Sequence, residues 1–192
     1  MRVPCVILLA VVLATVGCSA QPRPATVQIV PQQPGSSRYV QRFTDTYAVQ
    51  RNDGRTDVVL TETTQDGLDQ YLHLRLLWRP MRGTKTDQPS TTNAVIDWYV
   101  FSQTDPNQFL RYTGAGLVSA DPKGNGMDVT VRNATLRLAG RRGNLVDPLG
   151  PSTLKGAFRA RVDGGRVDQT LAELQAATAR GQGAGPARVG TK

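Results

Sequence analysis

The sequence predicts an all-β or β-rich fold, namely an antiparallel β-sandwich or open barrel of about 6–8 strands with one C-terminal amphipathic helix. Apolar and polar residues alternate along several runs, as they do on half-buried strands. Turn-forming residues separate these runs, and one helical pattern follows the last of them. Strands and helices do not alternate along the chain, so a parallel sheet of βαβ units is excluded.

The clearest alternation occurs in the runs 71–78 and 95–101. Their inward residues are expected to be Leu72, Leu74, Leu76 and Trp78 in the first run and Ile96, Trp98 and Val100 in the second. The other side of the second run also carries apolar residues, so we expect this strand to be covered on both faces.

Two turns predict hairpins. Asn52-Asp53-Gly54 is typical hairpin turn chemistry and lies between two strand-like runs. The segment 121–126 is rich in glycine, asparagine and aspartate, and it separates the run 110–119 from the run 127–138. Each pair of runs is therefore expected to form antiparallel neighbours.

The run 127–138 changes phase near Asn133. The apolar residues before and after that point have opposite parity, namely Met127, Val129 and Val131 against Ala134, Leu136 and Leu138. One extra residue near Asn133, a β-bulge, would keep both sets on one face. Two short strands around a bend are the alternative. A further strand is expected at 154–162, with its inward residues Phe158, Ala160 and Val162.

Helical spacing begins after Gly164-Gly165, which interrupts the strand pattern. The residues that recur at this spacing are Val167, Leu171, Leu174 and Ala177. They predict an amphipathic helix near 167–179. Its N-cap is either Thr170, in a capping box with Glu173, or Asp168.

The first residues have the layout of a secretory signal peptide. Arg2 precedes an apolar run from Val3 to Val16, which is short for a hydrocarbon core about 30 Å thick. The run ends at Gly17-Cys18, which resembles the lipobox of bacterial lipoproteins. This resemblance covers 1–18 only and implies cleavage before Cys18, acylation of that cysteine and attachment to a membrane of the cell envelope. The alternative is cleavage after Ala20, which would give a secreted or periplasmic protein.

The chain divides into four segments: a signal peptide (1–17), a Pro/Gln-rich tether (18–37), a single β-rich domain (38–179) and a disordered tail (180–192). Within the tether, the apolar patch 27–30 could instead add an edge strand. Cys5 lies in the segment to be removed, so a mature chain would contain no disulfide and no thiolate metal site.

The formal net charge of +8 favours anionic partners. An exported chain of this kind is expected to meet an anionic envelope component, such as headgroups, lipopolysaccharide phosphates or cell-wall carboxylates, or another envelope protein, and not nucleic acid. The candidate contacts are Arg79, Arg82 and Lys85 in a long loop and Arg132, Arg137, Arg159 and Arg161 on two strands. The strand arginines would equally fit an ordinary solvated sheet face.

Catalytic motifs are absent from the sequence. His73 is the only histidine, and no nucleophile or metal-binding spacing surrounds it. We therefore expect no catalytic residue, no metal and no cofactor, and we interpret the chain as a membrane-tethered envelope lipoprotein with a non-catalytic binding or assembly role. The alternative is an exported hydrolase that uses a face shared by His73 and Asp97, which would form if their two strands pair.

Overall fold

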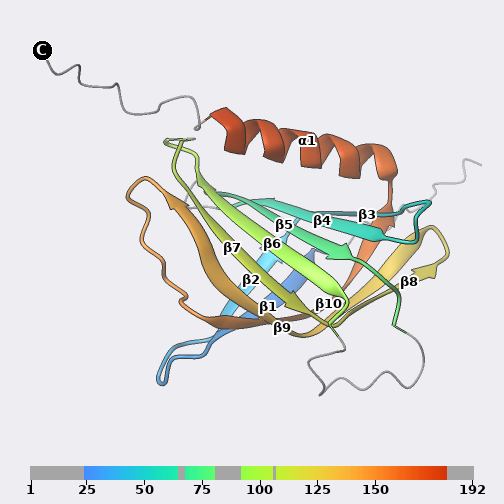
Figure 1. Ribbon diagram of the computed structural model, residues 1–192, viewed down its shortest axis with the longest axis horizontal. Coiled ribbons are helices and arrows are strands. Elements are labelled where there is room, and N and C mark those ends of the chain that lie inside the picture. Colours follow the sequence, from blue (N-terminus) through green and yellow to red (C-terminus); the bar gives the residue numbers. More distant parts are fainter. Residues whose placement is uncertain (1–23, 65–67, 81–91, 106, 181–192) are drawn as a thin grey trace, which may run out of the picture.

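The computed structural model of the protein describes residues 24–64, 68–80, 92–105 and 107–180. In this part of the chain, ten strands form one sheet and a single helix follows them (Figure 1). The elements are β1 (Ala25–Pro31), β2 (Tyr39–Phe43), β3 (Asp45–Gln50), β4 (Thr56–Thr63), β5 (Leu68–Leu76), β6 (Ala94–Ser102), β7 (Phe109–Gly116), β8 (Val118–Lys123), β9 (Gly126–Arg142), β10 (Ser152–Val162) and α1 (Gly164–Arg180). The β-rich prediction with one C-terminal helix is confirmed, but the expected strand number is too low.

The strands are ordered β2-β1-β10-β3-β4-β5-β6-β7-β9-β8, and β9 also pairs with β10. The pairings from β10 through β3 and β7 to β9 therefore form a closed ring. Every register is antiparallel except the short one between β10 and β3, which joins Arg161 to Tyr47 and Val162 to Ala48. The sheet is mixed, so the expectation of purely antiparallel pairing is wrong at this one join.

The hydrophobic core fills the inner face of the curved sheet. Its largest fully buried side chains come from strands of the ring and from β1 and β2, and include Phe43, Ile29, Leu60, Leu72, Leu74, Ile96, Tyr112, Leu136 and Leu154. Full burial of an apolar side chain of this size is worth roughly 1.5–3 kcal/mol, so the inner face is the main source of stability.

β1 corrects the predicted tether. Val27 and Ile29 are each 1% exposed, and β1 lies between β2 and β10. Residues 25–31 therefore belong to the sheet, and they form an interior strand instead of the edge strand considered as the alternative. The alternation of buried and solvent-facing residues in β1 is a strand pattern that the surrounding prolines and glutamines obscured. The earlier part of the predicted tether, 18–23, lies outside the described residues.

Both predicted hairpins are present, formed by β3 with β4 and by β8 with β9. The run 110–119 is nevertheless two strands, because the register of β7 with β9 ends at Thr113 and that of β8 with β9 begins at Val118. The fully buried Asn93 side chain fills this break. Its Oδ1 accepts the Val118 N–H at 2.8 Å, and its Nδ2 donates to the carbonyls of Val118 at 2.8 Å and Trp78 at 2.9 Å.

The break brings the backbones of β7 and β9 into close contact. A Cβ on Gly114 would lie 1.6 Å from the carbonyl oxygen of Thr135. A Cβ on Gly116 would lie 2.5 Å from the Cβ of Ala134. These two glycines therefore allow β9 to cross directly against β7.

The predicted β-bulge in β9 is confirmed. Leu154 is opposite Ala134, whereas Gly156 is opposite Val131, so one β10 residue faces both Arg132 and Asn133. This extra residue keeps the apolar residues on both sides of it in the core.

α1 begins at Gly164, earlier than predicted, and its N-cap is Asp163, whose Oδ1 accepts the Arg166 N–H at 3.0 Å. Both predicted caps are therefore wrong, because the two glycines belong to the first turn. The helix lies over the outer face of β3, β4 and β5 (Figure 1). There Val167 is fully buried and Leu174 is 7% exposed, and Val59 beneath the helix is 3% exposed.

Two apolar residues do not lie inward as predicted. Trp78 follows the end of β5 and is 39% exposed, and Val162 at the end of β10 is 51% exposed. Alternation identified the strands but not the points at which they leave the core.

Candidate functional site

The strand arginines predicted as contacts lie on the outer face of β9 and β10. These strands pair side by side, with Arg159 opposite Asp128 and Arg161 opposite Gly126. Arg132 projects from the bulge, and Arg137 lies further along β9. All four arginines are exposed. The structure therefore brings them together on one side of the sheet.

The strand order extends this surface to β1 and β2. Lys155 of β10 is opposite Gln28, and Gln28 is opposite Val40 of β2. Two register positions away, on the same face, Thr26 is opposite Arg42. The resulting surface, here named the basic face, consists of Arg42, Arg132, Lys155, Arg159 and Arg161. Sequence reasoning missed Arg42 and Lys155 because their neighbours come from strands more than a hundred residues apart in the chain.

Most of the charge on the basic face is not neutralised. Arg159 forms an ion pair with Asp128 at 3.2 Å, and Lys123 reaches the same carboxylate at 3.4 Å. Within the described ranges, Arg42, Arg132, Lys155 and Arg161 form no ion pair. Four cationic groups on the three strands β2, β9 and β10 therefore remain available to an anionic partner.

A shallow groove of about 420 Å³ lies where β7 crosses β9, beside the start of β10. Arg137 lines it together with Thr113, Thr135 and Gln32. The hydroxyl of Thr135 donates to the carbonyl of Ala115 at 3.2 Å, so Arg137 is the charged donor of the groove.

Of the contacts predicted in the long loop, Arg79 lies beside the basic face without being part of it, and the others lie outside the described residues. Arg79 forms an ion pair with Asp121 of β8 at 2.8 Å. Arg82, Lys85 and the predicted lipid attachment residue Cys18 lie outside the described residues, as do the predicted signal peptide and the tail beyond Arg180.

β5 and β6 pair so that His73 is opposite Asp97, as the hydrolase hypothesis requires. The two side chains nevertheless have different partners. His73 is 6% exposed, and its Nε2 is 2.9 Å from Oδ1 of Asp57. Asp97 forms an ion pair with Arg111 at 2.9 Å. His73 lies on the sheet face covered by α1. Neither His73 nor Asp97 lines the groove at β7 and β9 or the groove beside α1.

Asp57 is the centre of a network that links the sheet to the helix. Arg51 binds Asp57 at 2.9 Å and Asp168 of α1 at 2.7 Å. Burial raises the pKa of the Asp57 carboxyl, but the hydrogen bonds from His73 and Arg51 outweigh burial and hold this pKa at about 2. The carboxylate is therefore ionised at neutral pH, and the network holds α1 in place.

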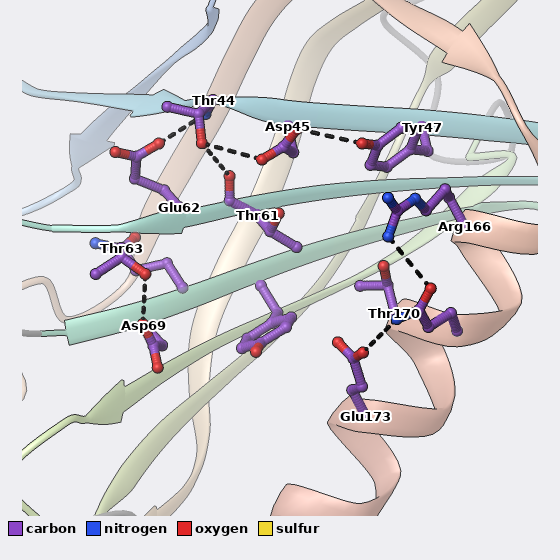
Figure 2. Close-up of a pocket in the computed structure, with 13 residues that line it drawn as sticks. Thr44, Asp45, Tyr47, Thr61, Glu62, Thr63, Asp69, Arg166, Thr170 and Glu173 are labelled. Atoms are coloured by element: carbon purple, nitrogen blue, oxygen red, sulfur yellow. Dashed lines mark hydrogen bonds between the residues drawn. The ribbon is translucent and has the colours of Figure 1, made fainter.

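An acidic groove of about 490 Å³ lies between α1 and the outer face of β3, β4 and β5. Figure 2 shows Arg166, Thr170 and Glu173 on the helix facing side chains on these strands. Four carboxylates line the groove, and in the part of the chain that is described none of them forms an ion pair: Asp45, Glu62, Asp69 and Glu173. They instead accept hydrogen bonds from neutral groups, such as the Thr44 N–H to Glu62 at 2.6 Å and the Thr63 hydroxyl to Asp69 at 2.6 Å.

Charge is thus segregated in the molecule, with cations on β2, β9 and β10 and carboxylates beside α1. Among the described side chains, no three His, Cys, Asp or Glu come together in a group able to hold a metal ion. No helix in the same part of the chain has both the length and the apolar character needed to cross a membrane. Comparisons with protein families, with curated proteins and with solved structures found no match.

Proposed function

We propose that this protein is an envelope lipoprotein, anchored through Cys18, whose β-rich domain binds an anionic component through the basic face. The observation that carries the proposal is the set of four exposed cations that have no ion-pair partner among the described residues, namely Arg42, Arg132, Lys155 and Arg161. An anion that lies across these strands would meet several of them at once.

The arrangement of the face supports binding to an extended surface. The four cations are spread over β2, β9 and β10 and do not converge on one point, as they would for a small ion. Basic side chains near an anionic membrane surface contribute about 1 kcal/mol each, and salt screens this attraction. Together the four groups would contribute about 4 kcal/mol to binding an anionic surface at low salt, and less at high salt.

The same geometry favours a binding role over the hydrolase. A general base must reach its substrate, whereas His73 is buried beneath α1 and bound to Asp57. Of the two expected architectures, we propose the barrel, which is supported by the ring of pairings from β3 to β10; this ring is closed, whereas the expected barrel was open.

A sedimentation assay tests this function with the chain from Ser19 onward, which contains every described strand and the helix but no lipid anchor. Binding is measured to vesicles with and without phosphatidylglycerol, to lipopolysaccharide and to purified cell wall, at low and high salt. We expect binding to at least one anionic preparation, loss at high salt and loss in Arg132→Glu/Lys155→Glu.

The matched control is Arg55→Glu/Arg166→Glu, which removes the same charge from the β3–β4 turn and from α1 and is expected to leave binding unchanged. Absence of binding to all three anionic preparations at low salt would refute the proposal. Equal loss in both double variants would also refute it, because net charge rather than the basic face would then control binding.

A further inference from the structure

Leu77 and Trp78 form an exposed apolar tip where β5 ends. Their exposed fractions are 51% and 39%. Large apolar side chains are normally exposed singly, whereas here two consecutive ones face solvent. Arg75 and Arg79 flank them in the sequence, and both are exposed.

The tip is held rigidly by backbone hydrogen bonds. The Leu77 N–H donates to the carbonyl of Asn93 at 2.8 Å, and Nδ2 of Asn93 donates to the carbonyl of Trp78 at 2.9 Å. Because Asn93 is fully buried, these bonds fix the two residues to the core. Their exposure is therefore part of the folded structure.

Two ion pairs, joined by the pairing of β8 with β9, connect the tip to the basic face. Arg79 binds Asp121 of β8 at 2.8 Å, and Asp121 is opposite Asp128 of β9. Asp128 in turn binds Arg159 at 3.2 Å. The apolar tip and the cations thus border one another, so a single partner could contact both.

We propose that Leu77 and Trp78 insert into the interfacial region of an anionic phospholipid membrane while the basic face binds its headgroups. Tryptophan prefers this interface because its ring is apolar and its N–H is polar. Apolar insertion combined with electrostatic attraction is how peripheral proteins bind such membranes. This inference rests on the proposed function and narrows its partner to a lipid surface.

Tryptophan fluorescence tests the insertion, because the chain has two tryptophans and the other, Trp98, is 6% exposed and donates to Gln70. The chain from Ser19 onward is mixed with phosphatidylglycerol vesicles, and the spectrum of Trp78→Phe, which reports Trp98 alone, is subtracted. We expect the Trp78 emission to shift to the blue and to be quenched by brominated acyl chains.

Binding is measured in parallel. Leu77→Ser/Trp78→Ser is expected to bind vesicles about tenfold more weakly, as the loss of a buried aromatic side chain implies. The matched control Val146→Ser, which removes a valine that is 79% exposed on another loop, is expected to bind as the wild type does.

Three outcomes would overturn the inference. If the wild type binds anionic vesicles through the basic face while Trp78 emission and tip-variant binding do not change, the tip does not insert and the proposed function stands. A blue shift that depends on protein concentration without vesicles would mean that a second copy covers the tip. Binding to lipopolysaccharide or cell wall but not to vesicles would exclude a phospholipid membrane as the partner, while the proposed binding role of the basic face would stand.

Discussion

Gly114→Ala is expected to destabilise the protein strongly. The new Cβ would lie 1.6 Å from the carbonyl oxygen of Thr135, which belongs to the backbone and cannot rotate away. Gly114 does not have a left-handed φ, so the cost is steric and does not come from the dihedral angle. Overpacking costs about 1–3 kcal/mol, and contact with backbone rather than a flexible side chain puts this variant at about 3 kcal/mol.

Thermal and urea unfolding monitored by circular dichroism measure this effect. For a chain of this length, a loss of about 3 kcal/mol lowers Tm by roughly 6–12 °C. Gly140→Ala is the matched control, because it lies in β9 and its nearest neighbour would be the Cβ of Arg111 at 3.9 Å. We expect this control to unfold within about 1 kcal/mol of the wild type. Wild-type stability of Gly114→Ala would refute the close crossing of β7 and β9.

Three further predictions concern other parts of the fold. Asn93→Ala leaves the N–H and carbonyl of Val118 without this partner and is expected to lower the free energy of unfolding by about 2–4 kcal/mol in urea titrations, whereas the exposed Asn107→Ala has little effect. Asp163→Ala removes the N-cap of α1 at a cost of about 0.5–2 kcal/mol, while Asp163→Asn, which can still accept the Arg166 N–H, restores most of it; equal losses in both variants would contradict the capping role. The pKa of Asp57, about 2 when folded, lies below its value of 3.8 without these contacts, so its contribution is present above about pH 4 and lost as the pH falls toward 2. Urea titrations from pH 6 to pH 2 are expected to show a smaller acid loss in Asp57→Asn than in the wild type, and identical profiles would contradict this assignment.

Local patterns in the sequence predict local structure well. Parity predicts the irregularity near Asn133, because an extra residue or a bend is needed to keep Val131 and Ala134 on one face, and the register shows that it is the β-bulge. The hairpin at Asn52-Asp53-Gly54 follows from turn chemistry, and Gly54 has the positive φ of 82° that such a turn requires.

Features that depend on distant segments are not predictable in this way. The place of β1 between β2 and β10 is fixed by long-range pairing, and nothing in the local composition indicates it. Asn93 carries no motif, since its role arises only where β7 and β8 separate. The basic face was predicted only in part. Parity identifies Arg159 and Arg161 as outward, but only the strand order, a long-range feature, brings Lys155 and Arg42 beside Arg132.

The position of β1 also limits how the protein can fold. Its register joins Val27 to Gly156 and Pro31 to Ser152, so among the described strands β1 must wait for β10 before it can complete its pairing. Such distant contacts slow folding and leave strand edges open in the meantime. The ring also cannot close until β10 is in place, so the last strand completes both the ring and the pairing of β1.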